Sequence, residues 1–213
     1  MAQRPLLLGH RGMRGFPSLK ENTIEAFDVA LQHGCDGFEF DLRLTADGRA
    51  VVCHDPENQG VTIARAGAGR LQQLPQLEHV LQRFHRKAFL DIELKVAGLE
   101  DRVMELLRQF PPQRGYVISS FLPEVLKRVD PRLPRGLISE TTTQLKRWAS
   151  LEVEYVMLHW KVLSEKLVQK THGSGAKIFT WTVNDATRMR QFAAWGVDGI
   201  ISDDPRLLVE TVG

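Results

Sequence analysis

Residues 22–42 read NTIEAFDVALQHGCDGFEFDL, a stretch that combines a helix with clear boundaries and the strand that follows it. Asn22 is suited to cap the start of the helix, because Glu25 three residues later completes a capping-box-like pair. Gly34 can adopt the left-handed conformation that ends a helix. An apolar run at 6–9 precedes the helix, so the start of the chain predicts a strand, a helix and a second strand.

Short apolar runs alternate with helical patterns along the rest of the chain as well. A second helix with clear ends is predicted from Asp185 to Trp195, with Asp185 as its cap and Gly196 just after it. This alternation is typical of an α/β fold with parallel strands. Eight such strands are predicted, at residues 6–9, 37–42, 88–94, 116–120, 135–139, 155–158, 177–182 and 199–202.

A further strand candidate at 50–54 does not fit this alternation, because only residues 45–49 separate it from the strand before it. So short a link requires an antiparallel hairpin. A turn centred on Asp47 and Gly48 would place His54 opposite Asp41. The same register pairs Thr45 with Ala50 and Arg43 with Val52.

Eight parallel strands with a short β-hairpin after the second strand predict a distorted TIM, or (β/α)8, barrel. A doubly wound open sheet is the alternative. That fold normally carries a glycine-rich phosphate loop after its first strand, and Gly9-His10-Arg11-Gly12 lacks the required glycine spacing. The barrel is therefore the preferred prediction.

Length, charge and cysteine content indicate the class of protein. A chain of 213 residues predicts a single domain over residues 1–213. The net charge of +2, from 28 Lys and Arg against 26 Asp and Glu, argues against a nucleic-acid partner or an acidic membrane surface. Cys35 and Cys53 lack CxxC spacing and are expected to be reduced, and no apolar run is long enough to span a bilayer. We therefore expect a cytoplasmic protein without stable membrane insertion.

Carboxylates gather at the carboxyl ends of two predicted strands, which is the working face of a barrel. Glu39 and Asp41 alternate with Phe38 and Phe40, so strand geometry places both carboxylates on one face. The strand at 88–94 contributes Asp91 and Glu93 in the same way. Carboxylates without cysteine are the ligands that Mg²⁺ or Ca²⁺ prefers, so a divalent metal is expected as cofactor.

Two cations and two histidines accompany these carboxylates. Arg11 and Lys95 suit an oxyanion such as a phosphate, which an arginine can hold through two parallel hydrogen bonds. His10 and His54 can remove or supply protons, because imidazole titrates near neutral pH. The residues by themselves thus indicate metal-assisted phosphoryl transfer on a small-molecule substrate.

Seven motifs in order resemble the signature of the glycerophosphodiester phosphodiesterase family, and they span nearly the whole chain. Each motif alone is weak evidence, whereas seven in sequence with plausible spacing rarely arise by chance. The motifs are Gly9-His10-Arg11-Gly12, Glu21-Asn22-Thr23, Phe38-Glu39-Phe40-Asp41, the segment 51–56 (VVCHDP), Ile92-Glu93-Leu94-Lys95, the segment 180–184 (TWTVN) and the segment 196–203 (GVDGIISD).

The resemblance implies a barrel that uses a divalent metal to hydrolyse glycerophosphodiesters to glycerol 3-phosphate and an alcohol. It implies that the chain uses two histidines for acid–base catalysis, with either water or the adjacent hydroxyl of the glycerol as nucleophile. Carried over residue by residue, it assigns metal binding to Glu39, Asp41 and Glu93, acid–base catalysis to His10 and His54, and phosphate binding to Arg11 and Lys95.

Two positions depart from the family pattern. The segment after Pro56 is shorter than usual, which affects the loop expected to cover the alcohol side of the site, and Lys20 stands where the family has proline. The alternatives to the glycerophosphodiesterase are a lysophospholipase D-like or cyclising phosphodiesterase, and a catalytically silent barrel that binds phosphodiesters.

Overall fold

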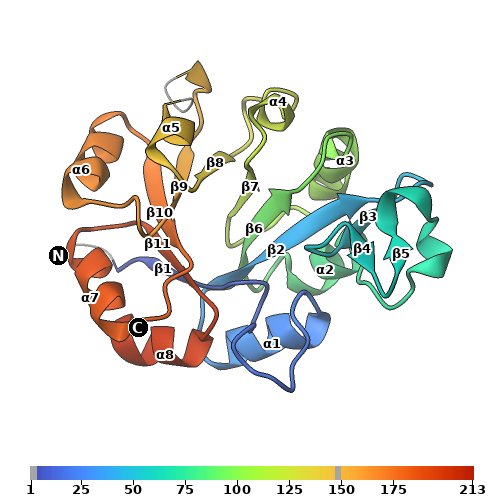
Figure 1. The fold of residues 1–213 in the computed structure, drawn as a ribbon, viewed down its shortest axis with the longest axis horizontal. Helices are drawn as coiled ribbons and strands as arrows, with labels where there is room; N and C mark the ends of the chain where they lie inside the picture. Colours follow the sequence, from blue (N-terminus) through green and yellow to red (C-terminus); the bar gives the residue numbers. More distant parts are fainter. Residues whose placement is uncertain (1–3, 147–149) are drawn as a thin grey trace.

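Eight parallel strands close into a ring in the computed structural model of the protein, which describes residues 4–146 and 150–213 (Figure 1). Neighbouring strands pair in the order β1, β11, β10, β9, β8, β7, β6, β2, and β1 also pairs with β2, which completes the ring. The fold is the TIM barrel that the sequence predicts, and not an open sheet. The strands are β1 (Leu6–Gly9), β2 (Gly37–Leu44), β6 (Phe89–Leu94), β7 (Tyr116–Ser120), β8 (Arg135–Ser139), β9 (Tyr155–His159), β10 (Lys177–Trp181) and β11 (Gly199–Ser202).

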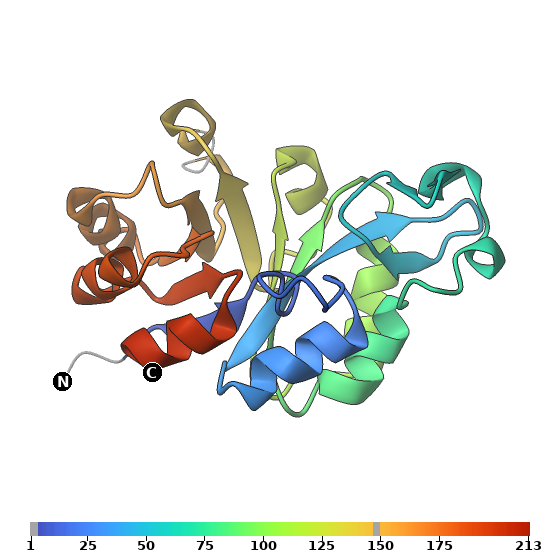
Figure 2. The ribbon, with the colours of Figure 1, turned by 60° about the horizontal axis from the view of Figure 1, so that its bottom comes forward.

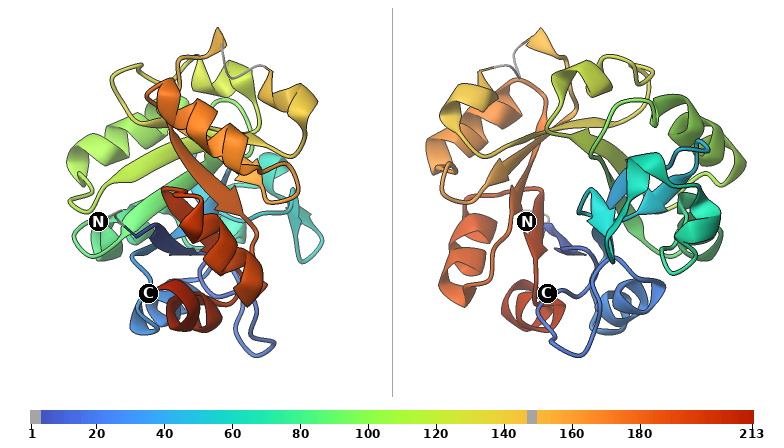
Figure 3. Two further views of the ribbon diagram at one scale, coloured as in Figure 1. Left: turned by 90° about the vertical axis from the view of Figure 1, so that its left-hand side faces the viewer. Right: turned by 45° about the vertical axis from the view of Figure 1, so that its right-hand side comes forward.

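Helices surround this ring, as Figure 3 shows most clearly in its right-hand view. Two of them, α4 and α5, have four residues each, so the outer layer beside β7 and β8 is irregular. In the described part of the chain, no helix combines the length and the apolar character needed to cross a bilayer. The helices are α1 (Ile24–Gln32), α2 (Leu77–Phe84), α3 (Glu100–Gln109), α4 (Pro123–Leu126), α5 (Thr142–Leu145), α6 (Glu165–Gly173), α7 (Ala186–Ala194) and α8 (Pro205–Val212).

The alternation along β2 divides its side chains between two environments. Phe38 and Phe40 point outward into the layer between strands and helices, where both are fully buried. The ring of Phe27 from α1 stacks on that of Phe38, with centroids 4.2 Å apart. Burial of one such side chain contributes about 1.5–3 kcal/mol to stability. This outer packing anchors β2, so its alternate residues, Glu39 and Asp41, face the interior of the barrel.

Apolar side chains fill the lower part of the barrel interior. Leu8, Phe89, Val117 and Phe179 belong to one buried cluster that strands from around the ring supply. A filled interior is usual for this fold, and it leaves space for ligands only at the carboxyl ends of the strands. The polar residues of the barrel interior are therefore concentrated at that end.

The short strand β3 (Ala50–Val52) pairs antiparallel with β2, as expected, but the predicted register is wrong by one residue. The observed pairs are Leu44 with Ala50, Arg43 with Val51 and Leu42 with Val52. The turn has three loop residues, not two, because the N–H of Thr45 bonds to the carbonyl of Arg49 at 3.0 Å. Gly48 takes the left-handed conformation (φ +76°) that a three-residue hairpin needs. Cys53, and not His54, therefore lies beside Asp41, to whose carbonyl its N–H donates at 3.0 Å.

The chain after β3 forms a small extension beside β2, seen to the right in Figure 2. It packs around a satellite cluster formed by Val51, Ile63, Ala66, Leu71 and Leu74. Its elements are β4 (Glu57–Asn58), β5 (Val61–Thr62) and the 3-10 helices η1 (Ile63–Arg65) and η2 (Ala68–Arg70).

The start of α1 also differs from the prediction. Thr23, and not Asn22, caps the helix, because its Oγ1 accepts a hydrogen bond from the N–H of Ala26 at 3.2 Å. At the other predicted helix, Asp185 caps α7 and Gly196 follows its end in the left-handed conformation, as expected. The side chain of Asn22 is thereby free to turn toward β2.

Candidate active site

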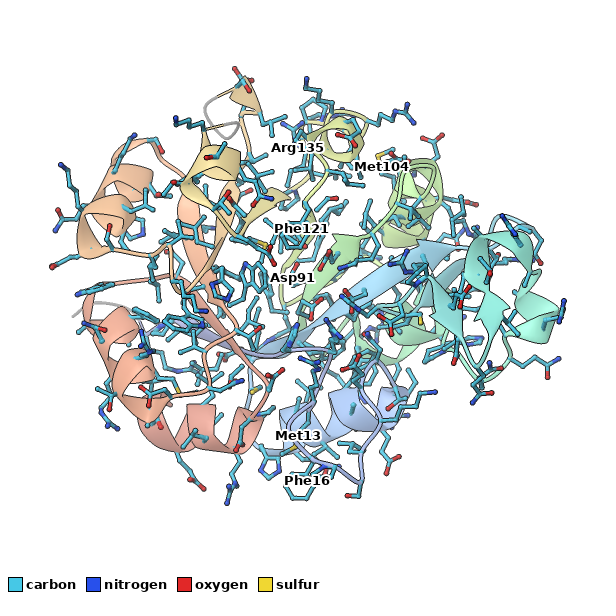
Figure 4. All side chains as sticks on the ribbon, in the orientation of Figure 1. Met13, Phe16, Asp91, Met104, Phe121 and Arg135 are labelled. Carbon is cyan, nitrogen blue, oxygen red and sulfur yellow. The ribbon has the colours of Figure 1, made fainter. Side chains whose placement is uncertain are left out.

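A cavity of about 230 Å³ opens at the carboxyl ends of the barrel strands. Six of the seven predicted site residues line it, and the seventh, Asp41, contacts two of those six. Figure 4 shows Asp91 and Phe121, which also line this cavity, inside the ring of strands. The predicted residues at its surface are His10, Arg11, Glu39, His54, Glu93 and Lys95.

Three carboxylates come together because β2 and β6 are neighbours in the ring. Their register places Glu39 beside Asp91 and Asp41 beside Glu93. Glu39, Asp41 and Glu93 each offer a carboxylate oxygen, and these three atoms all lie within 4.8 Å of one another. All three residues are buried. Such a set can hold a divalent cation, with water and substrate completing the coordination.

The two predicted cations balance this negative charge. The Nε of Arg11 lies 3.2 Å from Oδ2 of Asp41. The Nζ of Lys95 lies 3.3 Å from Oδ1 of Asp41 and 2.7 Å from Oε1 of Glu93. Both side chains also reach the cavity, so each can contact an anionic ligand there while it remains beside the carboxylates.

This arrangement separates the acidities of the three carboxyl groups. Burial opposes ionisation of Asp41, but the nearby Lys95 and Arg11 lower its pKa below the ordinary value. Burial and the charge of Asp41 raise the pKa of Glu93 to about 7, although Lys95 counteracts them. Burial, followed by repulsion from Asp41 and Glu93, raises the pKa of Glu39 well above its ordinary value. The cluster thus favours an added cation, or protons in its place.

One oxygen of Glu39 supports a metal site directly. Its Oε2 accepts a hydrogen bond from the N–H of Arg11 at 2.9 Å. Its Oε1 is buried and has no hydrogen-bond partner among the described residues. A buried carboxylate oxygen without a partner is costly unless a cation or a proton satisfies it. The donor set therefore fits a hard divalent ion such as Mg²⁺ or Ca²⁺.

His10 lies where β1 ends, with its ring between two acidic side chains. Its Nδ1 is 2.6 Å from Oδ1 of Asp203, and its Nε2 is 3.8 Å from Oε2 of Glu39. Asn184 donates to the other oxygen of Asp203 at 2.7 Å and so fixes that carboxylate. Asp203 belongs to the last of the seven sequence motifs but is not among the predicted site residues. The position of Asp203 just after β11, at the carboxyl end of a barrel strand, was the available signal.

His54 reaches the cavity from the segment after β3. Its Nδ1 lies 2.8 Å from Oδ1 of Asp55, and the Nε of Arg43 donates to its backbone carbonyl at 2.7 Å. Asp41 interacts electrostatically with this imidazole even though the two residues are not paired in the hairpin. The predicted placement of His54 opposite Asp41 is therefore wrong, although the two side chains interact electrostatically.

Asn22 is a second residue whose position the sequence analysis did not anticipate. Its Nδ2 donates to Oδ2 of Asp41 at 2.8 Å, and its Oδ1 accepts from the N–H of Asp41 at 3.4 Å. Asn22 takes a left-handed backbone conformation (φ +58°), which asparagine tolerates better than most residues. The side chain thus fixes one carboxylate of the cluster, and helps to lower its pKa.

Glu21, next to Asn22, holds the two arginines of the first loop. Its Oε1 accepts from Nη1 of Arg11 at 2.7 Å, and its Oε2 accepts from Nε of Arg14 at 2.6 Å. Arg11 is thereby held at its tip by a hydrogen bond to Glu21, and its guanidinium also forms an ion pair with Asp41. These contacts orient a guanidinium that would otherwise move freely on its long side chain.

The loop that carries His10 and Arg11 turns sharply. Arg11 and Gly12 both have left-handed backbone conformations, with φ of +51° and +81°. A Cβ on Gly12 would lie 2.6 Å from the backbone carbon of Ala26 in α1. Only glycine fits this contact, so the packing of the turn on α1 sets the position of Arg11.

Asp91 forms the floor of the cavity beneath the three carboxylates. It accepts a hydrogen bond from Oγ of Ser119 at 2.6 Å. Burial raises its pKa to about 8, with a smaller contribution from Glu93, while Ser119 counteracts them. The sequence pattern placed Asp91 on the same face as Glu93, and the structure agrees.

Comparison with known proteins gives consistent results over nearly the whole chain. The model of the Glycerophosphoryl diester phosphodiesterase family matches residues 10–90 and 65–207. A glycerophosphodiester phosphodiesterase of Caldanaerobacter subterraneus subsp. tengcongensis is 30% identical in an alignment that covers 98% of each chain.

Solved structures agree with the sequence comparisons. A glycerophosphodiester phosphodiesterase from Thermotoga maritima superposes with a TM-score of 0.87 at 25% identity, and the match covers 98% of each chain. A glycerophosphodiester phosphodiesterase from Parabacteroides distasonis has a TM-score of 0.84 at 25% identity, over 98% of this chain and 97% of that one.

Proposed function

Because the chain belongs to the glycerophosphoryl diester phosphodiesterase family, we propose that it hydrolyses glycerophosphodiesters to glycerol 3-phosphate and an alcohol. One observation carries the proposal beyond family membership. A single cavity brings together a carboxylate cluster, two histidines and the cations Arg11 and Lys95, which are groups suited to metal-assisted hydrolysis of a phosphodiester.

The phosphate of the substrate binds between Arg11 and Lys95. Both cations lie in the cavity wall on the side of β1, β2 and β6. Contacts to Asp41, Glu21 and Glu93 hold them in place before the substrate arrives. Preorganised cations of this kind stabilise the negative charge that develops on phosphoryl oxygens during the reaction.

Glu39, Asp41 and Glu93 hold a divalent metal, either Mg²⁺ or Ca²⁺. The unpartnered oxygen of Glu39 and the hard donor set support this assignment. A divalent ion held by these carboxylates would supply Lewis-acid polarisation and positive charge for the reaction. Asn22 and Lys95 keep the carboxylate of Asp41 ionised and oriented for that purpose.

His10 and His54 move the protons. One imidazole removes a proton from the attacking hydroxyl, which is that of water or the adjacent hydroxyl of the glycerol. Attack by water gives glycerol 3-phosphate directly, whereas attack by the glycerol hydroxyl gives a cyclic phosphate, which a water molecule then opens to glycerol 3-phosphate. The other imidazole gives a proton to the alcohol oxygen as its bond to phosphorus breaks, so the alcohol leaves in neutral form. Contacts to Asp203 and Asp55 orient the two rings through Nδ1 and leave Nε2 of each for the substrate.

A turnover assay tests this function. The purified protein is incubated with glycerophosphocholine, glycerophosphoethanolamine and glycerophosphoglycerol, in Mg²⁺, in Ca²⁺ and in excess EDTA. We expect metal-dependent release of glycerol 3-phosphate, identified by enzymatic coupling and by phosphorus NMR. Release of a cyclic phosphate as the end product would instead identify a cyclising phosphodiesterase. No turnover of any diester with either metal would contradict the proposal.

A further inference from the structure

The cavity has two unlike halves, and they follow the order of strands around the ring. Elements from β1 to β6 contribute charged side chains, among them Arg11 and Lys95. The lining residues from β7 to β11 are mostly apolar, and include Phe121, Ile138 and Trp181. A phosphodiester has one charged centre and two arms, so an arm of the substrate must face the apolar half when the phosphate lies between the cations.

Two aromatic rings form the wall nearest the phosphate-binding cations. Phe121 and Trp181 pack edge to face, with ring centroids 5.6 Å apart. The indole is fixed because its Nε1 donates to the carbonyl of Met157 at 3.1 Å. The Nζ of Lys95 lies over the ring of Phe121, 5.6 Å from its centroid, so this wall begins directly beside the proposed phosphate position and one of its rings already attracts a cation.

Glu140 lies at the rim of the same half, immediately after β8. It is the sole charged side chain that β7 to β11 and the described residues after them contribute to the cavity lining. Its side chain is exposed, and its carboxylate interacts electrostatically with His159 without an ion pair or a hydrogen bond to a described residue. An exposed carboxylate at the rim of an aromatic wall attracts a cation and gives no advantage to an anionic group.

We propose that this half of the cavity, formed by Phe121, Trp181 and Glu140, binds the quaternary ammonium of a choline head group. The inference rests on the proposed function and specifies its substrate as glycerophosphocholine. Aromatic faces attract quaternary ammonium ions, and a nearby carboxylate adds to that attraction. Two carbon atoms separate the nitrogen of choline from its ester oxygen, which suits a wall that begins next to the phosphate contacts.

Other head groups fit this wall less well. The hydroxyls of a glycerol or an inositol would face Ile138, Met157 and Ile201, where few polar groups could replace their bonds to water. The primary ammonium of ethanolamine carries three N–H donors, which the apolar wall leaves largely unpaired. A trimethylammonium group has no N–H donors, so it loses least when it enters this half.

The test compares kcat/KM for glycerophosphocholine with kcat/KM for its uncharged isostere, the 3,3-dimethylbutyl ester, in which carbon replaces the nitrogen. We expect the wild-type enzyme to prefer the choline ester about tenfold, from the combined attraction of the rings and the rim carboxylate. Glycerophosphoethanolamine is expected to be a poorer substrate than glycerophosphocholine. A ratio near one, or preference for ethanolamine, would overturn the inference.

Variants assign the preference to individual residues. Glu140→Gln and Phe121→Leu are each expected to lower the ratio of choline ester to isostere about threefold. Glu124→Gln changes an exposed glutamate of α4 outside the cavity, and serves as a control that keeps the ratio. If Glu140→Gln and Phe121→Leu hydrolyse both esters with the wild-type ratio of kcat/KM, only the inference about the choline head group is contradicted. If the wild-type enzyme hydrolyses no diester, the proposed function is contradicted.

Discussion

The Nδ1 of His10 lies 2.6 Å from Oδ1 of Asp203, although 193 residues separate the two along the chain. The contact exists because β1 and β11 are neighbours in the closed ring, with Gly9 paired to Ser202. Asn184 and Arg14 also contact Asp203. Burial opposes ionisation of Asp203, but the hydrogen bond with His10 lowers its pKa below the ordinary value. Asp203 is thus an ionised partner that selects the tautomer and the orientation of the imidazole.

Asp203→Asn is expected to lower kcat about 100-fold, because the amide no longer fixes the His10 tautomer. The binding cations remain, so KM changes much less than kcat. Nitrogen NMR of the His10 ring should show a changed tautomer population. Asp198→Asn is a matched control, since Asp198 contacts His172 at 2.8 Å, in a pair that does not line the cavity. Equal effects of both variants on kcat would contradict the positioning role.

Replacement of either cavity histidine tests acid–base catalysis. His10→Ala and His54→Ala are each expected to lower kcat by about 10²–10⁴-fold, because each removes one proton-transfer group. His79→Ala, an exposed substitution on α2, is the control. Steady-state kinetics with glycerophosphocholine provide the measurement. Near wild-type turnover in either cavity variant would show that the assignment of that histidine is wrong.

Stability of the metal-free protein is expected to fall as pH rises from about 5 to 8. The folded-state pKa of Glu93 is about 7 and that of Asp91 about 8, both above their ordinary values. The folded protein therefore binds more protons than the unfolded chain in this window, and deprotonation at higher pH removes the difference. Deprotonation of Glu93 alone would lower the free energy of unfolding by about 3 kcal/mol across its titration. Thermal unfolding in EDTA across this pH range measures the trend.

Two variants isolate the source of this pH dependence. Glu93→Gln should reduce the fall of Tm with rising pH in EDTA. Glu154→Gln, at an exposed position paired with Lys177, should leave this fall unchanged. Added Mg²⁺ or Ca²⁺ should raise Tm more at pH 8 than at pH 5, because protons compete with the metal for the carboxylates. A Tm in EDTA that rises with pH would contradict the expected direction.

Two glycines with the same backbone conformation are expected to respond differently to substitution. Gly12 and Gly48 have φ of +81° and +76°, but a Cβ would overlap the backbone of Ala26 only at Gly12. Gly48→Ala should therefore cost about 1 kcal/mol, and Gly12→Ala about 3 kcal/mol. Gly12→Ala should also lower kcat/KM, because Arg11 shifts with the turn. Equal losses in urea unfolding would show that the contact with α1 is not what constrains the turn.

The alternation of strand and helix patterns was sufficient to predict the barrel, because both periodicities are local properties of the chain. The same period-2 pattern placed Glu39 and Asp41 on one face, opposite Phe38 and Phe40. The local pattern did not predict the register of β3, because one residue more or less in the turn changes it. A two-residue and a three-residue turn around Gly48 are equally compatible with the sequence, and the choice shifts the register of β3.

The fold class, the positions of the barrel strands and the chemical types of residue at the strand ends could be predicted from the sequence, since they depend on local spacing and on side-chain chemistry. Which of these residues meet depends on the tertiary packing. Closure of the ring places Asp203 against His10. Thr23, and not Asn22, caps α1, and the side chain of Asn22 bonds to Asp41 instead. Contacts of this kind join segments that are far apart in the chain, so local sequence patterns do not specify them.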